Sequence, residues 1–119
     1  AIDYVSELGM DRIEAHVHGL LDFATARAEQ VSGMRIFGSV PGKAGILSFE
    51  FQGIHAHDLG TILDHEGVAI RTGHHCAMPV MEHYAVPATA RATFALYNTM
   101  AEIDSLYAAI DKAREIFRT

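Results

Sequence analysis

The chain of 119 residues has no tryptophan, a single cysteine and three prolines. One cysteine excludes an internal disulfide framework and is typical of a reducing compartment, so we expect a cytoplasmic protein. Ten glycines and three prolines are too few for a collagen-like or low-complexity chain. The sequence starts at Ala1, without an initiator Met or signal-peptide features and inside an amphipathic pattern, so we expect a piece of a longer protein.

Basic charge is also scarce. The chain has 9 Lys and Arg against 15 Asp and Glu, a net charge of -6, and its basic residues are scattered. Nucleic-acid-binding proteins carry clustered Lys and Arg in excess, so this class is excluded. No apolar run approaches the roughly 20 residues that cross a bilayer, which excludes a membrane span. Half of the residues are apolar, enough at this length for one core and one domain over residues 1–119.

The apolar residues that are present change their spacing along the chain. Spacings of three and four predict helices, and alternation predicts strands with one buried face. A short stripe at 2–8 ends at Gly9, and Asp11 can cap the helix that follows it. The other predicted helices cover 58–66, 79–84 and 99–117, the last opened by a capping box of Thr99 and Glu102. The predicted strands cover 34–37, 46–51, 68–71 and 91–97.

This order of elements predicts the fold class. Helices and strands that follow one another in this way suit an α+β fold, a two-layer sandwich in which helices cover one face of a four-stranded, mostly antiparallel sheet. Pro41 and Gly42 suit the two central positions of a type II turn between the first two strands. The order of the strands within the sheet does not follow from the sequence.

The candidate chemistry lies between Arg71 and Pro79, where Gly73 opens a loop that holds His74, His75 and Cys76. The short helix after this loop presents its amide end toward the thiol, and Arg71 adds positive charge; both favour thiolate. Two imidazoles can relay protons near neutral pH. Cys76 is therefore a candidate nucleophile, although a lone intracellular cysteine is commonly a small buried apolar residue.

Arg91 lies fifteen residues beyond Cys76, at the start of an alternating segment. A guanidinium there can hold a carboxylate through two parallel hydrogen bonds. The alternative is a structural ion pair or a solvated edge residue.

The remaining histidines give weaker signals. His55 and His57 can form a metal pair in extended chain, or simply cap the helix that follows. His74 and Cys76 with a remote histidine make a conceivable zinc site, but the chain has no second cysteine and no CxxC or HExxH spacing. Lys43 and Lys112 are the only lysines, and neither lies in a cofactor or phosphate-loop motif.

The stretch Gly67-Val-Ala-Ile-Arg-Thr-Gly-His-His-Cys-Ala-Met-Pro79, together with Pro87-Ala-Thr-Ala-Arg-Ala-Thr-Phe-Ala-Leu-Tyr-Asn-Thr99, closely resembles the C-terminal part of the SufS-type cysteine desulfurases. These are NifS-like enzymes with the class V aminotransferase fold, fold-type I, that use pyridoxal phosphate. The resemblance extends to Gly9-Met-Asp-Arg-Ile-Glu-Ala-His16 and to Gly53-Ile-His-Ala-His-Asp58, so it covers nearly the whole chain.

The resemblance implies specific roles. The family converts L-cysteine to L-alanine and leaves a persulfide on a protein cysteine, here Cys76; close relatives act on selenocysteine as lyases. Arg91 matches the arginine that holds the substrate carboxylate, Arg71 a second active-site arginine, and His74 and His75 the residues beside the nucleophile. The sulfur is expected to pass to an acceptor protein of the SufE or SufU type for iron–sulfur cluster assembly. The full-length enzyme is expected to be a homodimer.

The resemblance also implies what lies elsewhere. In this fold the large domain supplies the lysine that binds pyridoxal phosphate and most of the phosphate contacts, and none of those motifs is in this sequence. We therefore expect the chain to be the small C-terminal domain, which alone neither binds the cofactor stably nor turns over cysteine. Two alternatives remain open: a small metal-binding module built on the histidines and Cys76, and a partner-docking module without catalysis.

Overall fold

A computed structural model describes residues 1–118. Its elements are α1 (Ile2–Leu8), α2 (Met10–Glu29), β1 (Met34–Phe37), β2 (Ile46–Phe51), α3 (Ala56–His65), β3 (Arg71–Gly73), α4 (Met78–Tyr84), β4 (Thr89–Thr93) and α5 (Met100–Phe117). No helix within this part of the chain is both long and apolar enough to cross a membrane.

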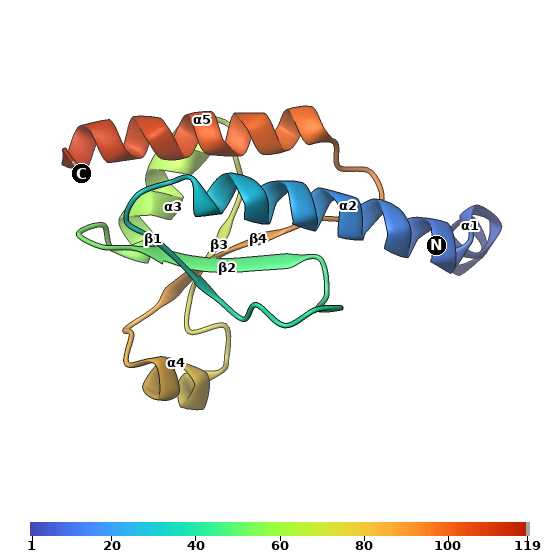
Figure 1. Cartoon of the computed structure of the whole chain (residues 1–119), viewed down its shortest axis with the longest axis horizontal. Coiled ribbons are helices and arrows are strands. Elements are labelled where there is room, and N and C mark those ends of the chain that lie inside the picture. Colours follow the sequence, from blue (N-terminus) through green and yellow to red (C-terminus); the bar gives the residue numbers. More distant parts are fainter. Residues whose placement is uncertain (119) are drawn as a thin grey trace.

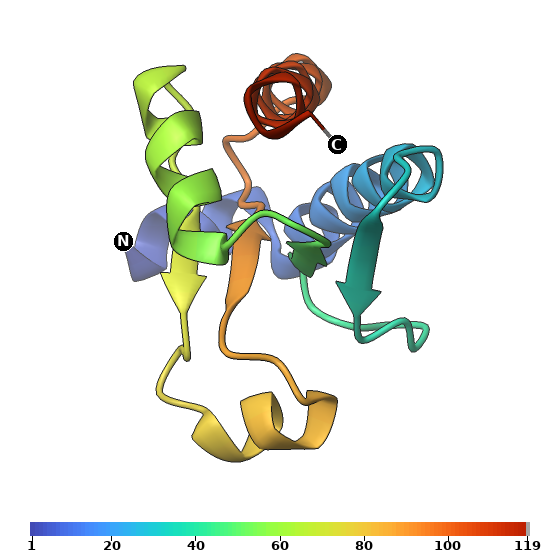
Figure 2. The ribbon, with the colours of Figure 1, turned by 90° about the vertical axis from the view of Figure 1, so that its left-hand side faces the viewer.

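The four strands form one antiparallel sheet in the order β1-β2-β4-β3 (Figure 2). Helices α2, α3 and α5 lie together on one side of it, while α4 lies on the other side (Figure 1). The predicted α+β sandwich is therefore confirmed, with α4 as an exception to helices on a single face. The exception arises because α4 begins only five residues after β3 ends and packs its buried Met81 beside the sheet rather than in the main core.

The core lies between the sheet and the three helices above it. Alternation in β2 directs Leu47, Phe49 and Phe51 into this layer, as the sequence predicts. Leu63 of α3 and Ile110 of α5 meet them there, both with no exposed surface. Gly45 lets α2 approach the start of β2, since a Cβ at this position would lie 2.1 Å from Val17 Cγ1.

Two predicted strands are displaced along the chain. The segment expected at 68–71 pairs only from Arg71 to Gly73, because Val68 and Ile70 pack against the core without entering a ladder. The strand expected at 91–97 runs instead over Thr89–Thr93. Its partner β2 begins at Ile46, opposite Thr93. The Phe94 amide still donates to the Gly45 carbonyl at 2.8 Å, and Phe94 is buried, but the strand itself ends at Thr93.

Three helix starts also differ from expectation. Gly9 precedes α2 in place of Asp11, which lies in the first turn, and α4 begins one residue before Pro79. α3 begins at Ala56 rather than residue 58 because the imidazole of His55 accepts a hydrogen bond from the His57 amide, at 3.1 Å from Nδ1 to N. The turn at Pro41 and Gly42 has the positive φ of 75° at Gly42 that a type II turn requires.

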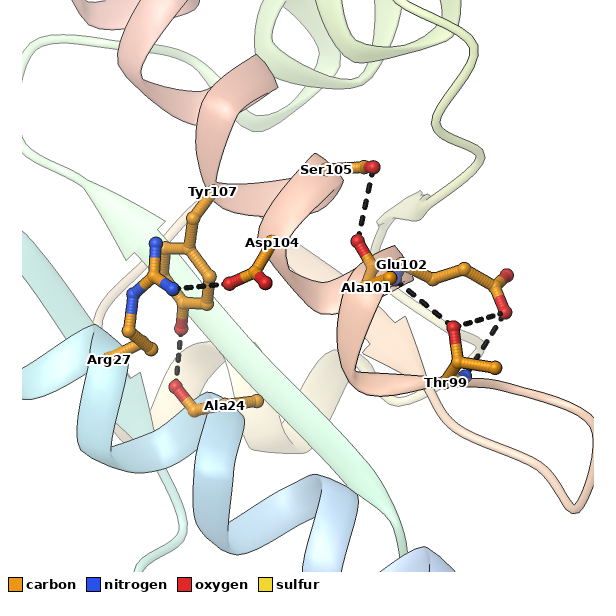
Figure 3. A network of polar contacts seen from close by, with 8 residues as sticks. All are labelled: Ala24, Arg27, Thr99, Ala101, Glu102, Asp104, Ser105 and Tyr107. Carbon is orange, nitrogen blue, oxygen red and sulfur yellow. Dashed lines mark hydrogen bonds and ion pairs between the residues drawn. The ribbon is translucent and has the colours of Figure 1, made fainter.

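The predicted capping box of α5 is confirmed (Figure 3). The Thr99 hydroxyl accepts from the Glu102 amide at 3.3 Å, and the Glu102 carboxylate accepts from the Thr99 amide at 3.1 Å. Further along α5, the Tyr107 hydroxyl donates to the Ala24 carbonyl of α2, which joins the two helices.

We expect Thr99→Ala to lower the free energy of unfolding by about 1 kcal/mol, because it removes this cap. Chemical denaturation measures the change. Ser105→Ala is the control, since its exposed hydroxyl bonds only to the Ala101 carbonyl of its own helix. Equal stabilities of the two variants would contradict the role of the cap.

Candidate active site

The candidate residues lie on β3, on β4 and on the loop that follows β3. The two strand residues are on the sheet face that is turned away from α2, α3 and α5. Arg91 lies on β4, and Arg71 on β3 is directly opposite it in the ladder. Residues 74–77 connect β3 to α4 beyond this edge of the sheet (Figure 2). Residues from two strands and a loop thus meet at one end of the molecule.

The two guanidinium groups form the electrostatic centre of this face. Directly opposed residues share a face with Cβ atoms about 5 Å apart, and like charges so placed repel. Among residues 1–118 no ion pair involves Arg71 or Arg91. The Nε of Arg91 is buried and has no hydrogen-bond partner within the same residues. This arrangement favours a bound anion that two positive groups can share.

Arg35 on β1 shows the contrasting case. Its guanidinium donates to Glu50 at 3.1 Å and is thereby occupied by a carboxylate of the protein. Within residues 1–118, Arg35 thus has the structural ion pair that was the alternative for Arg91, and Arg91 has none.

His75 is anchored to the start of β4. Its Nε2 lies 3.0 Å from the Thr89 hydroxyl oxygen and 3.2 Å from the Thr89 carbonyl oxygen. Burial lowers the pKa of His75 below its ordinary value; the hydrogen bond to the Thr89 carbonyl opposes this, and the charges of Arg91, Arg71 and His74 add to it. The ring is therefore neutral at pH 7 and able to accept a proton.

Cys76 is exposed and has a free thiol. Both His75 and Cys76 have φ of 56°, in the left-handed region that non-glycine residues seldom adopt. Such residues cost about 1–3 kcal/mol each and persist only where the surrounding structure holds them. The hydrogen bonds of His75 to Thr89, and of the Ala77 amide to the His74 carbonyl at 2.9 Å, supply that support.

A cavity of about 270 Å³ opens beside this loop. His75 and Arg91 line it together with two residues that the sequence did not single out, Ser48 and Thr89. Cys76, His74 and Arg71 do not line it; the first two are exposed on the loop beside it. The structure therefore places His75 and Arg91 at the same cavity and Arg71 opposite Arg91 on the neighbouring strand. The thiol of Cys76 lies outside the cavity.

Ser48 could have been found from the sequence, because the alternation of β2 puts it on the polar face of the strand. Its position directly opposite Arg91 depends on the register of β2 and β4. Thr89 gave no signal, since it precedes the segment predicted as a strand.

The lysines do not fit a cofactor site at this face. The Lys43 ammonium donates to the Gly38 carbonyl at 2.7 Å, and Lys112 pairs with Glu66 at 2.6 Å. Neither residue lines the cavity of His75 and Arg91. Residues 1–118 therefore offer no lysine for a covalent link to pyridoxal phosphate at this face.

The structure gives no support to the metal-binding alternative. In the described part of the chain, no group of three or more His, Cys, Asp or Glu side chains is arranged to hold a metal ion. His55, one of the candidate ligands, uses its Nδ1 to cap α3.

The chain is an α+β domain in which two arginines lie opposite each other beside a loop with an exposed thiol. Residues 1–106 match the aminotransferase class-V family, and the chain belongs to it. It is 48% identical to a probable cysteine desulfurase of Xylella fastidiosa and 42% identical to a cysteine desulfurase of Yersinia pseudotuberculosis, over 98% of this chain in both cases. The chain spans only 28% of the length of these relatives.

Solved structures agree with the sequence relatives. The cysteine desulfurase CsdA of Escherichia coli superposes with a TM-score of 0.90 and 31% identity, over 97% of this chain and 28% of that protein. The cysteine desulfurase of Thermococcus onnurineus gives the same TM-score at 32% identity, over 98% of this chain and 29% of that one. The chain thus shares the fold and sequence of the cysteine desulfurases over a part of their length.

The exposed thiol leads to a first prediction for this site. Iodoacetamide added to the folded chain should give one adduct by mass spectrometry, on Cys76 and without denaturant. The Cys76→Ser variant should give none. Labelling that requires denaturant would contradict the exposure of the thiol.

The charges around His75 lead to a second. Arg91→Ala should raise the pKa of His75 toward 6.5, because it removes a positive neighbour, while burial keeps the pKa below that value. Histidine NMR signals followed through a pH titration measure this, with Arg35→Ala as the control.

The same lowered pKa affects stability. Below pH 6.5 the unfolded chain takes up a proton at His75 that the folded chain resists, so acidification through this range favours unfolding. His75→Gln should lose this contribution to the pH dependence of unfolding. An unchanged dependence would contradict the assigned environment.

Proposed function

We propose that this chain is the small C-terminal domain of a cysteine desulfurase dependent on pyridoxal phosphate, in which Cys76 collects sulfur from L-cysteine. The observation that carries the proposal is the pair of guanidinium groups that have no carboxylate partner among residues 1–118, next to a loop that exposes the one thiol. The names of the relatives support the choice of substrate.

In this proposal Arg91 binds the substrate carboxylate and Arg71 adds positive charge beside it. The Cys76 thiolate then forms a bond to the substrate sulfur as the bond between that sulfur and the substrate carbon breaks. The carbon keeps the electron pair and takes a proton. One protein thiol and one L-cysteine thus give one persulfide and one L-alanine, and no external oxidant or reductant is needed.

The residues that hold pyridoxal phosphate lie outside this sequence in the proposal, in keeping with the positions of Lys43 and Lys112. The chain alone should then release no alanine from L-cysteine and retain no cofactor after gel filtration. The relatives extend well beyond the 119 residues, which supports this division.

The exposed position of Cys76 bears on its partners. A short loop held at both ends restricts the reach of the thiol, so an acceptor protein of the SufE or SufU type must come to it. Delivery for iron–sulfur cluster assembly, a homodimeric enzyme in the cytoplasm, and action on selenocysteine complete the proposal.

We test the proposal in the full-length enzyme with two substitutions. Cys76→Ser should abolish persulfide formation and alanine release while the cofactor absorbance is kept. Arg91→Ala should raise KM for L-cysteine, by about 10-fold or more, because it removes a charged carboxylate contact. Arg35→Ala is the matched control on the same sheet face and should leave KM unchanged.

The outcomes also distinguish the proposed catalytic role of Cys76 from the partner-docking alternative. Full alanine release by Cys76→Ser would overturn the role of the thiol and favour docking without catalysis. An unchanged KM in Arg91→Ala would overturn the role of the guanidinium.

A further inference from the structure

Thr89 presents both of its oxygens to one nitrogen of His75. Thr89 is buried, with 3% of its surface exposed, at the first position of β4. A carbonyl oxygen can only accept a hydrogen bond, so the Nε2 that lies 3.2 Å from it must carry the proton. The Thr89 hydroxyl oxygen, 3.0 Å from Nε2, is the second acceptor of a bifurcated hydrogen bond. In the neutral ring, Nδ1 is therefore the atom with a free electron pair.

Nδ1 lies in an unusual place for such an atom. It is shielded from solvent and has no hydrogen-bond partner within residues 1–118, and the same is true of Arg91 Nε. His75 and Arg91 line the same cavity of about 270 Å³. Buried polar atoms are almost always paired, so two unpaired ones at a single cavity indicate groups that are satisfied by a ligand.

The charged groups that face His75 come from three elements: Arg91 from β4, Arg71 from β3 and His74 from the loop. All three oppose a positive charge on the ring. A proton accepted at Nδ1 is therefore held only transiently, which suits a group that takes a proton and returns it.

We propose that Thr89 is a positioning residue, whose carbonyl and hydroxyl oxygens fix the tautomer of His75 and so make Nδ1 its proton acceptor at the cavity shared with Arg91. This rests on the proposed function. A substrate group bound in that cavity passes a proton to Nδ1 and keeps the electron pair of the broken bond. Thr89 touches no reacting atom and acts only through His75.

The ring nitrogens give the direct test. In ¹⁵N-labelled chain, long-range ¹H–¹⁵N spectra above pH 7 should show His75 with a protonated Nε2 and a bare Nδ1. Thr89→Val keeps the branched shape and the carbonyl, so Nε2 should stay protonated. It removes the hydroxyl, one of the two acceptors of Nε2, so the Nε2 signal should shift. Thr89→Ser should restore the original signals. Thr93→Val, at an exposed position on the same strand, is the matched control.

The full-length enzyme gives the second test. Thr89→Val should lower the rate of persulfide formation by about 2- to 10-fold, the effect of one neutral hydrogen bond, and move the pH profile of that rate, while Thr89→Ser restores both. His75→Gln can keep a donor to Thr89 but has no base at Nδ1, so it should fold normally and lose more of the rate.

Each outcome decides the question. A protonated Nδ1 in the unaltered chain, an Nε2 signal that does not move in Thr89→Val, no rescue by Thr89→Ser, or full activity of His75→Gln would overturn the proposal. Should Thr89→Val fail to fold, the spectra of the unaltered chain and the activity of His75→Gln still decide it. The spectra need no turnover, so an unaltered enzyme that forms no persulfide would refute the proposed function and leave the tautomer assignment standing.

Discussion

The pairing of β3 with β4 is the constraint on which the site depends. Its register sets Arg71 opposite Arg91 and Gly73 opposite Thr89, and the loop that carries His75 and Cys76 begins directly after. Side chains alternate between the faces of a strand, so a slip of one residue would turn Arg91 into the core and an alanine toward the site. The buried Ala90 and Ala92 on either side of Arg91 make such a slip costly, because the core has no partner for a guanidinium.

A strand of three residues needs support from outside its own ladder. α3 supplies it, packing so closely on β3 that a Cβ at Gly60 would lie 2.8 Å from Thr72 Cγ2. Val68 and Ile70, just before the strand, pack against the core. The positive charges and left-handed residues at the site are unfavourable locally, and this packing holds them in place. Close packing beneath β3 thus offsets the local cost of the strained loop.

How far the sequence predicts this molecule depends on whether a feature is local. The two strands at Met34–Phe37 and Ile46–Phe51 and the capping box at Thr99 follow from alternation and from a pair of residues three apart, and all three are confirmed. The sequence misplaces the limits of β3 and β4 because Ile70 and Phe94 pack against or into the core although both lie outside the strands. The residues around them, together with the family resemblance, made Cys76 and Arg91 candidates. Alternation places Ser48 on the polar face of β2, but its position opposite Arg91, like that of Thr89 opposite Gly73, depends on strand register, which no local pattern encodes.

The loop between β3 and α4 fixes the position of the thiol. Residues 74–77 are held at one end by the ladder and at the other by α4, and the ring of His75 is fixed to Thr89 between them. A thiol on so short a loop has little freedom to move relative to the strands, and this restriction is the reason for the acceptor protein in the proposed function. Cys76 is exposed beside the cavity that His75 and Arg91 line, and it does not line that cavity itself. The register of two strands and one short loop therefore sets the position of the thiol relative to both arginines.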